Sequence, residues 1–385
     1  MRIAQIAPLM ESCPPRLYGG TERIVSYLTE ELVRQGHDVT LFASGDSHTA
    51  GQLEPFSETA LRLDPGIKDP TPDHLVMLDS VRARAEDFDV LHFHVDLLHY
   101  SFIQDFIGRT VTTVHNRMDL EELKRVYSAF AKAPLVSISQ DQRSAMPNLN
   151  WAGTVYHGLP PNLLPFCSAP QRDYFAFLGR IAPEKGPERA IEIASRAGAR
   201  LKIAAKVDSA DQAYWESVIK PLIEAHSNVE YVGEINEREK GSFLGNASAL
   251  LFPIDWPEPF GMVMIEAMAC GTPVIAFRRG SSPEILDEGV SGFLVGDVDE
   301  AVVAAGRVGE LDRLQIRRQF EQRFSIERVA REYLRIYRSL PGVRKLTRGQ
   351  RQNSHFADTI ADGPLGTSIQ RRINVSSNLP TTRAL

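Results

Sequence analysis

Short apolar runs alternate with helix-like segments along most of this chain, and that alternation restricts the possible folds more than any other feature. The first run, Ile3 to Ala7, precedes a segment from Glu22 to Arg34 whose apolar residues recur at helical spacing. Such alternation is typical of parallel α/β domains. Residues 45–72 show little periodicity and predict an irregular excursion. Further strands of the first half are expected at 39–43, 90–94, 112–115, 135–139 and 154–157.

A proline-rich stretch interrupts the alternation at residues 158–173, where prolines can continue neither a helix nor a central strand. We therefore expect an N-terminal Rossmann-like domain over 1–157, a linker over 158–173 and a second Rossmann-like domain over 174–325. Two doubly wound parallel sheets of this kind predict a ligand cleft, because such sheets bind ligands at the C-terminal ends of their strands. The strands of the second domain are expected at 174–178, 202–205, 229–232, 249–252, 274–277 and 293–295.

The C-terminal part of the chain predicts one more helix and a tail. Residues 326–340 carry Val329, Tyr333, Leu334 and Tyr337 at helical spacing. Residues 341–385 are rich in polar residues and lack periodicity, which predicts a mostly disordered segment.

Composition narrows the function classes without identifying one. The net charge of −6 gives no electrostatic support for nucleic-acid binding. The three cysteines, Cys13, Cys167 and Cys270, lack metal-ligand spacing and favour a reducing compartment. No run of about 18 apolar residues exists, and the N-terminus does not resemble a signal peptide. We expect a cytoplasmic protein; contact with a membrane surface is not indicated, and the oligomeric state stays open.

A pair of glycines follows the first strand of the first half, and a pair of cations follows the first strand of the second half. Gly19 and Gly20 precede a helix, an arrangement that suits phosphate, although an ordinary tight turn explains the pair equally well. Arg180 and Lys185 flank the loop after the first strand of the second half. Arginine can hold two phosphate oxygens and lysine adds a point charge, so the pair fits a diphosphate. Two solvated side chains are the alternative.

The segment from Asp255 to Pro273 carries the strongest signal. Glu258 lies in a loop after an apolar strand, a helix begins near Met262, and Glu266 follows one turn into it. Carboxylates accept from vicinal hydroxyls, and free N–H groups at the start of the helix suit sugar or phosphate oxygens. This segment predicts a sugar or nucleotide site.

These motifs together resemble a known family. The segment from Glu258-Pro-Phe-Gly to Glu266-Ala-Met-Ala-Cys-Gly-Thr-Pro is similar to the signature of retaining family-4 glycosyltransferases of the GT-B fold. The Arg180 and Lys185 element, Gly280-Ser-Ser-Pro-Glu-Ile, Gly292-Phe-Leu-Val and Thr113-Val-His115 resemble other motifs of that family. Ser281 stands where many members have glycine, and His157 where asparagine is commoner.

The resemblance implies a role for each matching position. Arg180 and Lys185 would neutralise the leaving diphosphate, and His115 would contact the donor sugar near the reacting centre. Glu258 would hold the transferred sugar and Glu266 the ribose. The other donor contacts would be Gly19, Gly20, Gly233, Ile235, Phe260, Gly261, Met262 and Val263. The catalytic set implied is His115, Arg180, Lys185 and Glu258. Helix 326–340 would cross back onto the first domain.

The implied mechanism uses no protein nucleophile, no metal and no other cofactor: the leaving phosphate accepts the acceptor proton on the same face. His94 and Asp96 are the candidates for acceptor binding, and a zinc site built on the neighbouring histidines is the weaker alternative. We further expect Glu266→Ala to abolish transfer with little change in the thermal midpoint.

The substrates are less defined. The stretch Pro14-Pro-Arg-Leu-Tyr-Gly-Gly20 and the strand end Ala43-Ser-Gly-Asp-Ser47 look similar to UDP-glucose-dependent glucosyltransferases acting on small acceptors such as tetrahydrobiopterin. A UDP-sugar donor, glucose and a hydroxylated acceptor are therefore the first expectations. A sugar-nucleotide epimerase on the same fold and a non-catalytic nucleotide-sugar-binding protein are the alternatives.

Overall fold

The computed structural model of the chain describes residues 1–16 and 19–343. Of the segment predicted to be mostly disordered, 341–385, all but residues 341–343 therefore lie outside the described residues. Within the described part, no helix is long and apolar enough to cross a membrane.

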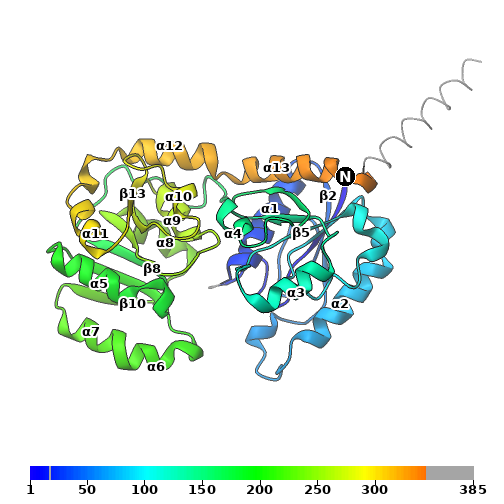
Figure 1. The fold of residues 1–385 in the computed structure, drawn as a ribbon, viewed down its shortest axis with the longest axis horizontal. Helices are drawn as coiled ribbons and strands as arrows, with labels where there is room; N and C mark the ends of the chain where they lie inside the picture. Colours follow the sequence, from blue (N-terminus) through cyan, green and yellow to red (C-terminus); the bar gives the residue numbers. More distant parts are fainter. Residues whose placement is uncertain (17–18, 344–385) are drawn as a thin grey trace, which may run out of the picture. The chain divides into compact units, whose positions relative to one another are not determined.

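The first sheet has seven parallel strands in the order β3-β2-β1-β4-β5-β6-β7 (Figure 1). The reversal of strand order beside β1 is the doubly wound arrangement that the alternating sequence predicts. The strands are β1 (Arg2–Ile6), β2 (Asp38–Ala43), β3 (Gln52–Pro55), β4 (Val90–Phe93), β5 (Thr110–Thr113), β6 (Leu135–Ser137) and β7 (Trp151–Thr154).

The second sheet repeats this design with six parallel strands in the order β10-β9-β8-β11-β12-β13. Its central strand β8 follows the proline-rich stretch. The strands are β8 (Phe175–Arg180), β9 (Leu201–Lys206), β10 (Val229–Gly233), β11 (Ala249–Phe252), β12 (Val274–Phe277) and β13 (Gly292–Val295).

Helices connect the strands, as parallel sheets require. Those of the first half are α1 (Gly20–Arg34), α2 (Thr71–Ala83), α3 (Glu121–Ala129) and α4 (Gln140–Ser144). Those of the second half are α5 (Pro187–Arg196), α6 (Gln212–Tyr214), α7 (Lys220–Ala225), α8 (Glu237–Gly245), α9 (Met262–Ala269), α10 (Ser282–Ile285), α11 (Val298–Ala305), α12 (Arg313–Arg323) and α13 (Ile326–Ser339).

Two edge strands differ from the sequence prediction. Strand β3 lies inside the excursion predicted to be irregular. It pairs only with β2 and is partly exposed. Because an exposed edge strand buries few side chains, it lacks the apolar run from which a strand is predicted. Strand β7 ends where a strand over 154–157 was predicted to begin. It pairs only with β6, and its residues are half-buried. The apolar residues on which the prediction rested, Val155 and Tyr156, come after the strand.

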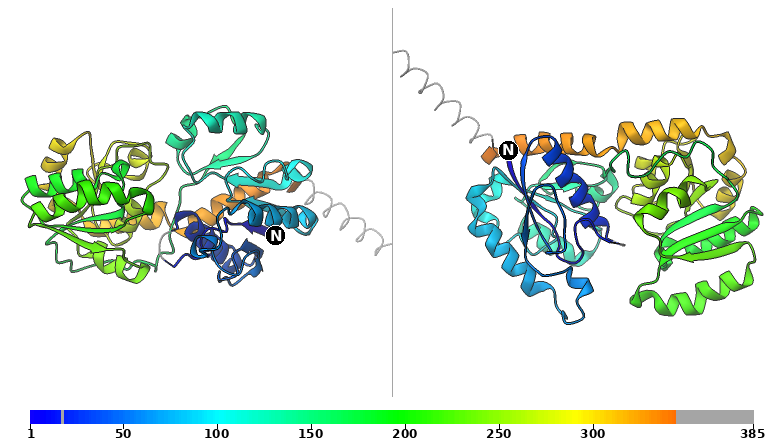
Figure 2. Two further views of the ribbon diagram at one scale, coloured as in Figure 1. Left: turned by 90° about the horizontal axis from the view of Figure 1, so that it is seen from below. Right: turned by 180° about the vertical axis from the view of Figure 1, so that it is seen from behind.

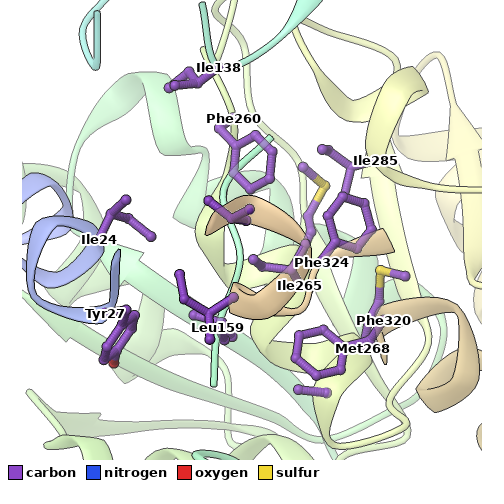
Figure 3. Close-up of a cluster of buried hydrophobic side chains, with 14 of the residues drawn as sticks. Ile24, Tyr27, Ile138, Leu159, Phe260, Ile265, Met268, Ile285, Phe320 and Phe324 are labelled. Carbon is purple, nitrogen blue, oxygen red and sulfur yellow. The ribbon is translucent and has the colours of Figure 1, made fainter. Parts of the chain in front are cut away.

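Buried side chains from distant parts of the chain pack together around α9, α12 and α13. Figure 3 shows Ile24 and Tyr27 of α1 in one cluster with Leu159, Phe260 and Phe324. Helix α13 packs against α1 (Figure 2). The side chains of Tyr333 and Tyr337 on this helix are buried. This packing places the C-terminal helix of the described chain against the N-terminal sheet.

Candidate active site

Arg180 is the last residue of β8 and sits in an acidic surrounding. Its guanidinium donates to Glu184 at 2.5 Å and pairs with Asp211 at 3.0 Å. Asp208 lies 3.9 Å away. Three carboxylates thus neutralise a cation that is predicted to meet a diphosphate, and a diphosphate would have to replace some of them.

Lys185 is paired with the second predicted site element. Its ammonium forms an ion pair with Glu258, and it lies 4.7 Å from the centre of the Trp256 ring. Arg117, which follows β5, lies 5.6 Å from the same ring. Trp256 therefore contacts cations attached to both sheets, a relationship that the spacing of residues along the chain did not reveal.

The loop that carries Glu258 is fixed by a close approach of the backbone at Gly280. Gly280 has a φ of +53°, and a Cβ there would lie 2.4 Å from the amide nitrogen of Glu258. Next to it, the Ser281 amide donates to the Glu258 carbonyl at 3.0 Å, and the Ser281 hydroxyl donates to the Phe260 carbonyl at 2.7 Å. Ser281, a departure from the resembled family, thus anchors the predicted sugar-binding segment.

That segment continues directly into α9. Gly261 precedes the helix in the left-handed conformation, with a φ of +78°. The amides of Met262 and Val263 come first in the helix, where N–H groups have no intrahelical acceptor. The local fold thus presents the N–H groups that the sequence predicted for this position.

Glu266 is buried within α9, and its partner is a residue that sequence reasoning missed. The Lys240 ammonium of α8 donates to one carboxylate oxygen of Glu266 at 2.7 Å, and the Glu266 side chain is 3% exposed. The second oxygen, Oε2, is buried and has no hydrogen-bond partner in the part of the chain that the structure describes. A capping box of Asn236 and Glu239 starts α8 and fixes the turn that carries Lys240.

The remaining predicted donor contacts lie at strand and helix ends. Gly19 and Gly20 mark the start of α1, and a Cβ at Gly19 would lie 2.8 Å from Pro15. Gly233 ends β10, and Ile235 follows it and packs partly against the core. Within residues 1–16 and 19–343, no hydrogen bond, ion pair or ring contact joins these residues to Arg180, Lys185 or Glu258.

His115 follows β5 and belongs to a group of aromatic rings. Its Nε2 lies 2.9 Å from Nδ1 of His94, and its ring stacks on His157 with centroids 5.2 Å apart. His157 in turn meets the Phe260 ring edge-on at 5.0 Å. Removal from water lowers the pKa of His115 to about 3, so this ring is neutral at physiological pH. His157 connects the predicted catalytic histidine to the predicted sugar-binding loop.

The two candidates for acceptor binding have different surroundings. His94 is 2% exposed and hydrogen-bonded on both ring nitrogens. Asp96 is exposed and accepts from the Asn116 amide at 2.5 Å. Of the two, only Asp96 presents a polar group to water.

Glu284 connects the two halves of the chain. Its carboxylate accepts from the backbone amides of Gln140 and Asp141, both at 2.7 Å, and from the Tyr156 hydroxyl at 2.9 Å. The two amides start α4, so Glu284 caps a helix of the first half from the second. A second link is the ion pair between Arg23 of α1 and Glu237 of α8.

Across residues 1–16 and 19–343, no cluster of three or more histidine, cysteine or carboxylate side chains is placed to hold a metal ion. Metal independence nevertheless stays a prediction.

Two doubly wound parallel sheets, with charged residues in the loops after β8 and β11, form a GT-B type fold. Two family models match the chain: one described as "Glycosyl transferases group 1" over residues 168–319, and one described as "Glycosyltransferase Family 4" over residues 18–145. The chain belongs to this family of GT-B glycosyltransferases, which transfer a sugar from a nucleotide or phospho-sugar donor.

Individual relatives agree with this assignment. The phosphatidyl-myo-inositol mannosyltransferase of Mycolicibacterium smegmatis is 24% identical, and the match covers 89% of this chain and 95% of the relative. Among solved structures, the sucrose-phosphate synthase of Thermosynechococcus elongatus superposes with a TM-score of 0.71 at 19% identity, covering 88% of this chain and 98% of the other. The Anabaena protein HepE, solved in complex with UDP and glucose, superposes with a TM-score of 0.67 at 20% identity, covering 88% of this chain and 100% of the other.

Proposed function

We propose that the protein is a cytoplasmic, retaining glycosyltransferase that transfers a hexose from a nucleoside diphosphate sugar to a hydroxylated acceptor. The first candidate for the donor is UDP-glucose. The observation that carries the proposal is the placement of Arg180 and Lys185 at one strand end, with Glu258 already paired to Lys185. The complex of HepE with UDP and glucose supports the choice of donor.

The cations act on the leaving group. When the bond between the sugar C1 and the phosphate oxygen breaks, its electron pair goes to the diphosphate, where Arg180 and Lys185 stabilise the new charge. Lys185 exchanges its carboxylate partner Glu258 for a phosphate oxygen, and the freed Glu258 carboxylate accepts from sugar hydroxyls. Each cation carries a charge-assisted bond of about 1.5–3 kcal/mol.

The acceptor attacks C1 from the face that the phosphate leaves, which retains the configuration. The new bond joins the acceptor oxygen to C1, and the acceptor proton passes to an oxygen of the leaving phosphate. No carboxylate of the protein is needed as nucleophile, and Arg180 and Lys185 supply the positive charge that a metal supplies elsewhere. His115 contributes a neutral ring beside the donor sugar.

A donor panel tests the proposal. Purified protein is incubated with UDP-, GDP- and ADP-sugars, alone and with a mixture of hydroxylated acceptors, and nucleotide release and products are followed by mass spectrometry. We expect binding and slow hydrolysis of one donor, faster nucleotide release with an acceptor, and a product with the donor's anomeric configuration by NMR. Isomerised donor without released nucleotide would indicate the epimerase, and binding without turnover a non-catalytic protein.

A further inference from the structure

A continuous series of hydrogen bonds leads from His115 into the interior and reaches α13. His115 contacts His94 at 2.9 Å, and Nε2 of His94 contacts the Gln5 side-chain oxygen at 2.8 Å. The Gln5 side-chain amide then donates to the Tyr337 hydroxyl at 3.2 Å. His94, Gln5 and Tyr337 are all buried.

The series continues from Tyr337 back to the sheet. The Tyr337 hydroxyl lies 2.8 Å from Nδ1 of His92, and Nε2 of His92 lies 2.7 Å from the Thr113 hydroxyl. That hydroxyl lies 2.8 Å from the hydroxyl of Tyr333. Two tyrosines of α13 thus hold side chains of β1, β4 and β5 in place.

The bonds of the Gln5 amide fix the proton positions at the His94 end of the series. The Gln5 oxygen can only accept, so His94 carries its proton on Nε2. Burial and the neighbouring histidines lower the pKa of His94 well below its usual value, so the ring is neutral and Nδ1 has a lone pair. His115 must then donate from Nε2, because one of the two facing nitrogens has to carry the proton.

One atom of the series is left without a partner. Nδ1 of His115 is buried and has no hydrogen-bond partner among the described residues. With the proton on Nε2, this Nδ1 is an acceptor. It lies in the ring that stacks on His157, which touches Phe260 of the predicted sugar-binding loop.

We propose that His94 is the positioning residue for His115: anchored through Gln5 to Tyr337, its Nδ1 accepts a hydrogen bond from the Nε2–H of His115, which leaves Nδ1 of His115 as an acceptor for a donor hydroxyl. The use of that acceptor rests on the function proposed above, whereas the proton position does not. This replaces the expectation that His94 itself meets the acceptor substrate.

A second buried histidine of the same segment provides a matched control. His99 is fully buried, contacts the Thr112 hydroxyl at 2.7 Å and stacks on Phe93 with centroids 4.6 Å apart. Among the described residues, none of its hydrogen bonds or ring contacts reaches His115. A substitution there therefore tests the effect of losing a buried histidine without disturbing the series.

The first experiment does not depend on activity. Long-range ¹H–¹⁵N correlation spectra of histidine-labelled protein report which ring nitrogen carries the proton. We expect His115 and His94 both protonated on Nε2, and we expect His115 to lose that single tautomer in His94→Phe but not in His99→Gln. A His115 ring protonated on Nδ1 in the wild type would overturn the proposal, whether or not a donor is found.

The second experiment measures donor turnover in a double-mutant cycle. His94→Phe should lower kcat about tenfold, the effect of roughly one hydrogen bond, with little change in the donor KM. The loss should vanish in a His115→Ala background, and His94→Asn, which keeps an oxygen near the Nδ1 position, should recover most of it. If the losses were additive, or if His99→Gln caused an equal loss, His94 would not act through His115 and its role would be structural only. An absence of turnover in the wild type would instead contradict the proposed function.

Discussion

The Lys240 ammonium lies 2.7 Å from the Glu266 carboxylate, and both side chains are largely withdrawn from water. Removing one member of such a pair leaves the other charge buried alone, which is usually more destabilising than removing both. This relationship changes what substitutions of Glu266 report, because stability and ligand binding are affected together.

Glu266→Ala should lower the free energy of unfolding by about 3 kcal/mol, because Lys240 loses its buried partner. This revises the expectation from sequence that the thermal midpoint would hardly change. The double variant Glu266→Ala/Lys240→Met should recover most of the stability, yet donor binding should stay lost. Urea unfolding and calorimetric titration with the donor measure the two effects. Recovery of binding in the double variant would contradict a ribose-binding role for Glu266.

Lys185→Gln should reduce kcat/KM for the donor by roughly ten- to a hundredfold, the effect of losing one charge-assisted bond to the diphosphate. Steady-state kinetics with the donor found in the panel provide the measurement. The control is Lys124→Gln, which removes another lysine paired with a glutamate, here Glu121 at 2.6 Å on the exposed side of α3. Equal losses of kcat/KM in the two variants would show that Lys185 does not bind the diphosphate.

Chelation should leave turnover unchanged, because Arg180 and Lys185 are proposed to supply the charge that would otherwise come from a cation. The rate of donor turnover is compared before and after dialysis against EDTA, and again after adding Mg²⁺ or Mn²⁺. A rate that falls on chelation and returns with either ion would show that the two side chains do not suffice.

Acid should destabilise the protein through its buried histidines, and His99 permits a clean measurement. Burial lowers the pKa of His99 to about 3, from an ordinary value of 6.5. Between these values the unfolded chain binds one more proton than the folded protein, so stability falls as the pH falls. The wild type should therefore lose about 1.4 kcal/mol per pH unit relative to His99→Gln between roughly pH 6 and 4. Urea unfolding of both proteins across this range checks it; parallel curves would contradict a neutral, buried His99.

The central strands and the motifs at their ends could be predicted from sequence, because both depend on short segments. Strand β11 is an uninterrupted apolar run, and Glu258 lies in the loop that follows it. The edge strand β3 was missed for the opposite reason: it is half-exposed and carries no comparable run.

The contacts of the site that were missed all join distant parts of the chain. Lys240 and Glu266 are 26 residues apart, and His92 and Tyr337 are 245 residues apart. The spacing of Tyr333 and Tyr337 predicted a buried helix face but did not show that their hydroxyls bond to polar side chains of the first sheet. Such pairs depend on how separate elements pack, and one sequence contains no direct record of that packing.

The position of Trp256 provides the protein with an intrinsic optical probe. Lys185 lies 4.7 Å and Arg117 5.6 Å from the centre of its ring, and the chain has only three tryptophans. Any ligand that draws Lys185 away alters the electric field at this ring, and with it the colour and intensity of its fluorescence. With Trp151 and Trp215 replaced by phenylalanine, occupancy of the diphosphate position could be followed in unlabelled protein, before any acceptor is known.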